Sequence, residues 1–182
     1  MNLVVFPLRH ENPFPTRVPT GSVSKMNERT LLCCSGMGSS GVANLRKALE
    51  EYTEITTVFE FGTAAAVSKG TVGKIYECTT FCNSDGNFSV SQKSTNLPPA
   101  AVTGSDELYT GGKYDWADRL EIPLLYTMET LRFRKVTLEF SKNFCSIRLA
   151  TDNGCGNIRE QVMHELEKAR SEIRRIFSDL TL

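Results

Sequence analysis

Residues 124–129 (LLYTME) form an apolar run that stops at an acidic residue, and a helical pattern follows directly. Residues 147–153 (IRLATDN) have the same plan, with apolar residues, an acid and then polar residues. Both stretches are typical of β-strands that end in a carboxylate. In open α/β sheets, ligands bind just beyond the carboxyl ends of the strands. We therefore expect Glu129 and Asp152 to share a site, where one carboxylate binds a ligand and the other donates a proton.

Similar apolar, β-branched runs recur along the chain and alternate with helical patterns. Helices are expected at about 40–52, from Glu129 to about 140, and from residue 158 onward, where Asn157 and Glu160 form a capping box. Strands are expected at 3–6, 30–34, 55–61, 71–80, 100–103, 123–127 and 144–150. This order favours a three-layer α/β sandwich around a mixed, largely parallel sheet. The length of 182 residues fits one domain, 1–182.

Two stretches are rich in turn-forming residues. Residues 12–29 contain three prolines, and residues 82–99 are rich in Ser, Asn and Gly and end in two prolines. Both are expected to be loops next to strand ends, where either could cover a ligand.

Charge and hydropathy exclude several classes of partner. The chain has 21 basic and 21 acidic residues and no basic stripe, so no strong field attracts nucleic acid or an anionic membrane. No apolar run reaches the ~20 residues that a membrane helix needs. The first residues have no basic lead and no small-residue cleavage site, and they are interpreted as a strand rather than a signal peptide.

Six cysteines are spread along the chain, several of them in strand-like runs. We interpret them as small buried hydrophobic residues in a reducing compartment, which predicts a cytoplasmic protein. Cys78 and Cys82 have metal-ligand spacing, but no second close pair follows, and His10 and His164 are isolated. No metal and no cofactor are expected.

Two glycine-containing turns follow predicted strands. Residues 35–41 (SGMGSSG) open a helix, a position where backbone N–H groups favour an anion or a hydroxyl-rich ligand. The acidic residue that completes a dinucleotide-binding fingerprint is missing, and a tight structural turn is an equal alternative. Residues 61–66 (FGTAAA) are interpreted as a second small-residue turn that leaves room for a ligand, with close packing as the alternative.

In this order, the motifs resemble the nucleoside phosphorylase and nucleosidase superfamily. The likeness is greatest to methylthioadenosine/S-adenosylhomocysteine nucleosidases and futalosine hydrolases, and it covers the first strand and most of residues 30–180. The motifs that carry it are Gly36-Met37-Gly38, Gly62-Thr63-Ala64, the stretch 101–106 (AVTGSD), Met128-Glu129, and Arg148 with Thr151-Asp152.

The resemblance implies roles for individual residues. Asp152 would protonate the departing base, with a pKa raised by burial, and such acid catalysis contributes ~10²–10⁴-fold. Glu129 would accept hydrogen bonds from the ribose hydroxyls, and Met128 would pack under the sugar. Further nucleoside contacts are expected from Gly38, Gly62, Thr63, Ser105 and Leu108.

The reaction itself is left open between two chemistries. Glu11 after the first strand, beside Arg148, matches the water-activating pair of the nucleosidases. Glu60 stands where the hexameric phosphorylases have a phosphate-binding arginine, which favours N-ribosyl hydrolysis of a purine nucleoside. Pro7-Leu8-Arg9, however, resembles the first phosphate-binding loop of the phosphorylases. Phosphorolysis is therefore the alternative, and a non-catalytic nucleoside-binding protein is a third.

Some features depart from the family. The chain is shorter than typical members, residues 12–29 are expected to lack a helix and a strand, and the segment before residue 100 looks trimmed. The 5′ substituent of the nucleoside is therefore left open. A homo-oligomer is expected, with exposed apolar residues near Tyr114 and Trp116 available for the contact.

Overall fold

The computed structural model describes residues 1–105, 107–112 and 114–181, so Asp106 of the AVTGSD motif lies outside the described residues. Nine strands and three α-helices follow one another along the chain. The helices are α1 (Gly38–Glu51), α2 (Thr130–Glu139) and α3 (Ile158–Thr181), with 3₁₀ turns η1 (Arg9–Glu11) and η2 (Ala117–Arg119). The strands are β1 (Asn2–Phe6), β2 (Ser22–Lys25), β3 (Thr30–Cys34), β4 (Thr57–Ser68), β5 (Ile75–Cys82), β6 (Phe88–Val90), β7 (Pro99–Thr103), β8 (Leu124–Tyr126) and β9 (Asn143–Asp152).

All nine strands join one mixed sheet in the order β2-β3-β1-β4-β8-β7-β5-β6, and β9 pairs with both β4 and β5. Five of the pairings are parallel, and four are antiparallel. The ladders β4-β8-β7-β5-β9 therefore close into a ring, whereas β2, β3 and β1 extend from it as an open sheet. The expected α/β class with a mixed sheet is confirmed.

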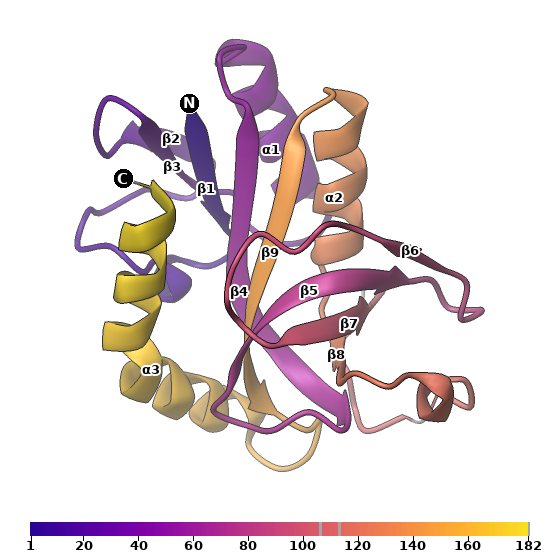
Figure 1. Cartoon of the computed structure of the whole chain (residues 1–182). Coiled ribbons are helices and arrows are strands. Elements are labelled where there is room, and N and C mark those ends of the chain that lie inside the picture. Colours follow the sequence, from indigo (N-terminus) through magenta and orange to yellow (C-terminus); the bar gives the residue numbers. More distant parts are fainter. Residues whose placement is uncertain (106, 113, 182) are drawn as a thin grey trace.

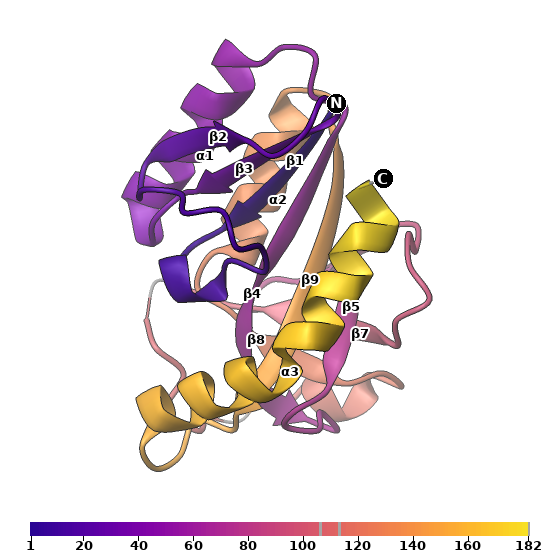
Figure 2. The same cartoon turned by 90° about the vertical axis from the view of Figure 1, so that its left-hand side faces the viewer.

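Helices cover both faces of the open sheet, as Figures 1 and 2 show: α1 and α2 lie on one side and α3 lies on the other. Leu45 and Leu49 of α1 pack with Phe133 of α2 against Leu3 and other side chains of the sheet. On the opposite face, residues of α3 at helical spacing, among them Leu166, Ile173 and Phe177, pack against Phe61 and Ile147. Full burial of each such side chain contributes about 1.5–3 kcal/mol, so these two layers fix the position of the strands between them.

Strand β4 changes its neighbour halfway along. Its first residues pair with β1 up to Glu60, and its last residues pair with β8 from Ala65 onward. Between these ladders, residues 61–64 have β9 on one side and no strand partner on the other within the described part of the chain. This interruption creates an opening in the sheet.

The FGTAAA stretch is therefore not a turn, and our prediction there was wrong. Residues 61–66 continue as strand β4, because β9 pairs with them from Phe61 onward. Small residues are needed for another reason. A Cβ atom at Gly62 would overlap the guanidinium of Arg148, so a larger side chain there would displace Arg148 from its place beside Glu60.

The expected loop at 12–29 was also wrong in part. Residues Ser22–Lys25 form β2, an antiparallel edge strand on β3 that follows Gly21, whose φ of 77° is positive. Similarly, β6 (Phe88–Val90) lies within the expected loop at 82–99 and pairs with the end of β5. Both strands are short and polar or exposed, so their sequences lack the apolar pattern that identifies interior strands.

Tyr114 and Trp116 do not form the exposed apolar surface that we expected. Both are partly buried against their own chain, packing with Ala117, Leu124 and neighbouring side chains. The Trp116 indole N–H also donates to the Ser84 carbonyl oxygen at 3.2 Å. Homo-oligomer formation stays a prediction without support from these two residues.

Two expectations from composition can be compared with the structure. Among the described residues, no helix is long and apolar enough to cross a membrane. All six cysteines are unpaired, and all except Cys155 are buried, as expected for small core residues.

Candidate functional site

A cavity of about 340 Å³ lies at the opening in the sheet, and its volume falls in the range typical of small-molecule sites. Its walls come from residues that follow the carboxyl ends of β1 and β8, from the last residue of β9, and from the middle of β4. The first turn of α3 closes another side. The sheet topology thus brings Glu129 and Asp152 to one cavity, as the two strand-end acids predicted.

Glu11 lies in η1, the turn that follows β1, and its side chain is buried at the opening in β4. Its Oε1 accepts hydrogen bonds from the Thr63 backbone N–H at 2.8 Å and from the Thr63 hydroxyl at 2.9 Å. Its Oε2 accepts a hydrogen bond from the Leu8 backbone N–H at 2.9 Å. Glu11 therefore takes the place of the missing strand partner and ties η1 to the sheet.

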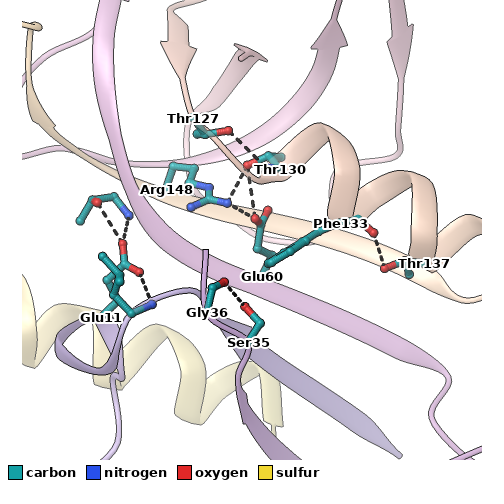
Figure 3. Close-up of polar contacts among 11 residues, drawn as sticks. Glu11, Ser35, Gly36, Glu60, Thr127, Thr130, Phe133, Thr137 and Arg148 are labelled. Atoms are coloured by element: carbon teal, nitrogen blue, oxygen red, sulfur yellow. Dashed lines mark hydrogen bonds and ion pairs between the residues drawn. The ribbon is translucent and has the colours of Figure 1, made fainter. Parts of the chain in front are cut away.

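Arg148 of β9 lies behind this wall and is fully buried. Figure 3 shows its guanidinium pointing at Glu60 of β4 and at Thr130 of α2. Its Nη2 forms an ion pair with Glu60 Oε1 and donates to the Thr130 hydroxyl at 2.6 Å. Burial alone would lower the pKa of Arg148, but Glu60 and the other nearby acids raise it above its ordinary value. Arg148 is thus a permanent cation that is already paired with a carboxylate.

The Glu60–Arg148 pair is not fully satisfied. Within the described part of the chain, Glu60 Oε2 and Arg148 Nε are buried and have no hydrogen-bond partner. Arg148 does not line the cavity, although its guanidinium lies against Gly62, next to Glu11. Its influence on the site is therefore mainly electrostatic.

Glu129 is the N-cap residue of α2 and is only 7% exposed. Burial, aided by the Glu11 and Glu60 carboxylates, raises its pKa to about 7, although Arg148 and a hydrogen bond from the Gly38 backbone oppose the shift. Its Oε1 is buried and has no hydrogen-bond partner among the described residues. Because Glu129 lines the cavity, this oxygen can accept a hydrogen bond from a ligand.

Asp152 is the last residue of β9 and is 5% exposed. The β4–β9 ladder pairs Ala64 with Ala150 but Ala65 with Asp152, so Thr151 is an extra, bulged residue. Bulges of this kind redirect the following side chain, and Asp152 lines the cavity. Its Oδ1 accepts from the Gly154 backbone N–H at 2.8 Å, and its Oδ2 accepts from the Thr151 hydroxyl at 3.0 Å.

The predicted ligand-binding residues divide into two groups. Thr63, Leu108 and Met128 line the cavity together with Glu11, Glu129 and Asp152. Gly38, Gly62 and Ser105 do not line it. Gly38 instead binds the Glu129 carboxylate through its backbone, and Gly62 makes room for Arg148. The Ser105 hydroxyl bonds the Tyr126 hydroxyl at 2.6 Å, so it supports a wall residue.

Several wall residues carry little or no signal in the sequence and were not predicted. The rings of Tyr109 and Tyr126 contact each other in a tilted arrangement, with centroids 5.2 Å apart and an interplanar angle of 32°, and both line the cavity. Ile158, Arg159 and Val162 of α3 form another, and His10 lines the cavity beside Glu11. The signal for α3 was present, because a helix that begins at residue 158 must start close to Asp152. Tyr109 follows a turn-rich stretch and had no comparable signal.

No group of His, Cys, Asp or Glu among the residues that the structure describes is arranged to hold a metal ion. Burial also raises the pKa of the Cys33 and Cys78 thiols to about 12. These thiols are therefore neutral core groups that do not act as nucleophiles.

No protein-family model matches the sequence, and neither does any curated protein. Solved structures do match the fold. A 5′-methylthioadenosine/S-adenosylhomocysteine nucleosidase from Chlamydia trachomatis, bound to adenine, has 15% identity and a TM-score of 0.75, with 99% of this chain and 96% of that chain covered. A variant of the Helicobacter pylori nucleosidase, with 5′-methylthioadenosine in its active site, has 14% identity and a TM-score of 0.77, with 98% and 96% covered.

A futalosine hydrolase from Helicobacter pylori is similar to the same degree, with 14% identity, a TM-score of 0.76, and 97% of this chain and 95% of that chain covered. At these identities the likeness concerns the fold, and the resemblance in fold to nucleosidases is confirmed. The matches span 95% or more of each of these structures, so the likeness extends over the whole fold. The trimmed segments stay a prediction.

Proposed function

We propose that the protein is an N-ribosyl hydrolase that cleaves a purine nucleoside into free base and sugar. The observation that carries this proposal is the charge arrangement of the cavity. Glu11, Glu129 and Asp152 reach it from three different elements, while the buried Arg148 behind it is already paired with Glu60. Cleavage of an N-ribosidic bond leaves positive charge on the sugar and negative charge on the base, so carboxylates around the sugar and an acid at the base suit this reaction.

Glu129 is proposed to hold the ribose. A buried acceptor without a partner costs about 1–3 kcal/mol, and this cost is recovered when a ligand hydroxyl donates to it. Glu129 Oε1 is such an acceptor within the described residues. Met128 lines the cavity next to it and offers an adaptable apolar surface to the sugar.

Asp152 is proposed as the general acid that gives a proton to the departing base. It lies at the carboxyl end of β9, and its two oxygens are oriented by Thr151 and Gly154. We expect the base to lie against Tyr109 and Tyr126, because both rings line the cavity and aromatic rings favour offset stacking with a purine.

Glu11 is proposed to position and activate the water. A carboxylate has about four acceptor positions, and Glu11 uses three of them, two on Oε1 and one on Oε2. Oε2 therefore retains capacity for a water molecule in the cavity. The hydrogen bonds from Leu8 and Thr63 fix the orientation of the carboxylate, as a general base requires.

Release of free base from methylthioadenosine, adenosylhomocysteine, inosine, adenosine and futalosine, measured by chromatography without phosphate, tests the proposal. We expect release from at least one nucleoside and a loss of ~10²–10⁴-fold for Asp152→Asn, the share that general acid catalysis typically supplies. We expect Glu11→Gln to stop hydrolysis while nucleoside binding persists. Full activity of Asp152→Asn would contradict the proposed acid.

Phosphorolysis is the second candidate, and one observation favours it. Arg159 lines the cavity, and in the described part of the chain no ion pair joins it to a carboxylate. Base release that requires phosphate and is lost in Arg159→Gln would assign the protein to the phosphorylases. Nucleoside binding without base release, with or without phosphate, would instead indicate a binding protein.

A further inference from the structure

A second hollow lies toward the other end of the β4–β9 pair, and the proposed reaction makes no use of it. It has a volume of about 570 Å³ and is bounded by the start of β9, by α2 and by the segment after β6. Thr57 and Phe59 of β4 line it, whereas Thr63 and Ala64 of the same strand line the nucleoside cavity. Since a strand rises about 3.3 Å per residue, the two sites are roughly 15–20 Å apart.

The lining of this groove is cationic. Lys93, Arg134 and Lys142 contribute to it, and none of the described residues that line it is acidic. Elsewhere in the chain, arginines such as Arg46 and Arg170 are paired with glutamates. No such pair joins Arg134 or Lys93 to a carboxylate within the described residues. In a chain with zero net charge, three grouped cations without acidic partners indicate an anionic ligand.

Arg134 is held in a defined orientation. Its guanidinium lies 4.4 Å from the centroid of the buried Phe81 ring. A cation over an aromatic face is attracted by the ring, and the guanidinium N–H groups that point away from the ring stay available for an oxyanion. Lys142 is also held, because its Nζ donates to the Thr53 carbonyl oxygen at 2.8 Å, which leaves two further donors.

The segment that joins β6 to β7 lines another side of the groove and is anchored to β5 by hydrogen bonds. Glu77 of β5 is buried and accepts hydrogen bonds from the Ser94 N–H at 2.6 Å and the Thr95 N–H at 2.8 Å. The Ser91 N–H donates to the Thr79 carbonyl oxygen at 2.8 Å. The backbone that carries Lys93, Ser91 and Ser94 is therefore held in place before a ligand arrives. Ligand binding does not have to order this segment.

The inner surface of the groove is apolar. Leu138 of α2 and Phe144 of β9 line it together with Phe59. In this region β9 has no strand on its β5 side among the described residues, because the β5–β9 ladder starts at Ser146. The groove thus offers an aromatic surface next to its cations and hydroxyls.

We propose that this groove binds a small phosphorylated molecule. Arg134 and Lys93 hold the phosphate with help from the Ser91 and Ser94 hydroxyls, and Phe144 contacts the apolar part of the ligand. A phosphate monoester carries up to two charges and several acceptor oxygens, which match two cations and two hydroxyls better than one carboxylate does. The volume suits a small molecule, and the absence of a longer basic stripe in the sequence argues against nucleic acid.

Titration of the protein with inorganic pyrophosphate at low ionic strength, followed by isothermal calorimetry, tests the proposal. We expect saturable binding that weakens about tenfold in Arg134→Gln and about three- to tenfold in Lys93→Gln. Lys135→Gln is the matched control, because Lys135 lies on the same helix, is exposed and does not line the groove. It should change the affinity less than about twofold.

Arg9→Gln and Arg159→Gln separate this groove from a phosphate site at the nucleoside cavity. Binding that is lost in either of them but kept in Arg134→Gln would overturn the proposal. The same holds if the wild-type protein does not bind pyrophosphate, or if Lys135→Gln weakens binding as much as Lys93→Gln does. Lys93 is on a surface segment, so its substitution keeps the test valid even if loss of the Phe81 contact destabilises Arg134→Gln.

Discussion

Glu60 and Glu129 are two buried acids that lie close enough to influence each other electrostatically, but their surroundings differ. Glu60 contacts a counter-cation, Arg148, and a hydroxyl, Thr130. Glu129 lines the cavity, its Oε1 has no partner among the described residues, and its pKa is raised to about 7 by burial. The charge of a buried acid beside a cation is compensated, so removing that acid leaves a buried cation without a partner, whereas an acid left unpaired at a cavity destabilises the free protein and is available to a ligand. The following substitutions test this difference.

Glu60→Gln should have the largest effect on stability. Removal of the carboxylate leaves the Arg148 guanidinium buried without a counter-charge, and breaking a buried pair in this way costs about 3–5 kcal/mol. Urea unfolding measures the change. Glu139→Gln is the matched control, because Glu139 pairs with Arg46 while 41% exposed, and its loss should cost about 0–1 kcal/mol. Equal effects of the two substitutions would show that Glu60 is not the structural acid.

Glu129→Gln should reduce activity and leave stability intact, whereas Glu60→Gln should reduce stability. An amide keeps the shape of the carboxylate but loses its charge near the sugar, so we expect base release to fall about 10²-fold, or about 2.7 kcal/mol. The folded protein should be no less stable than the wild type at neutral pH. A loss of stability together with full activity would reverse the roles that we assign to Glu60 and Glu129.

The stability difference between wild type and Glu129→Gln should depend on pH. The folded-state pKa of Glu129 is raised from 4.5 to about 7, so its stabilising contribution is fully present below pH 4.5 and is lost as the pH rises through 7. At pH 8 the variant should therefore be more stable than the wild type by roughly 3 kcal/mol, and near pH 4.5 the two should be equal. Urea titrations at pH 5, 6, 7 and 8 measure this, with the exposed Glu121→Gln as a control that should show no such trend.

Thr63→Val should have the smallest effect. Glu11, the third acid at this site, is held by hydrogen bonds, and the substitution removes the one from the Thr63 hydroxyl while the backbone N–H remains. We expect a loss of about 0.5–1.5 kcal/mol in stability and a modest loss of activity. Thr63→Ser keeps the hydroxyl and should behave like the wild type. An equal loss of stability in both variants would mean that the methyl group matters rather than the hydrogen bond.

The sequence predicted the parts of the molecule that depend on local pattern. The strand shortly before Glu129, the strand that ends at Asp152, and the helices that follow them have clear periodicity, and topology then brings the two acids to one cavity. Long-range pairing was not predictable in the same way. The Glu60–Arg148 pair joins residues 88 positions apart, and the exchange of β1 for β8 along β4 leaves no local signal in FGTAAA.

The candidate site was predicted only in part for a related reason. Small residues such as Gly38 and Gly62 look alike in a sequence whether they face a ligand or make room for a neighbour. Here neither lines the cavity: Gly38 has a positive φ of 61° and binds the Glu129 carboxylate through its backbone, and Gly62 makes room for Arg148. Tyr109 belongs to a stretch without regular structure, where no periodicity indicates which side chains point inward.

The way in which Glu11 replaces a strand at the opening in β4 has a kinetic consequence. The two hydrogen bonds from Thr63 hold η1 to the sheet, and neither of them belongs to a strand ladder. The turn can therefore detach and reattach as a small local unit while the sheet stays intact. Amide hydrogen exchange at Thr63 then reports how often the site opens, on a timescale that is independent of global unfolding.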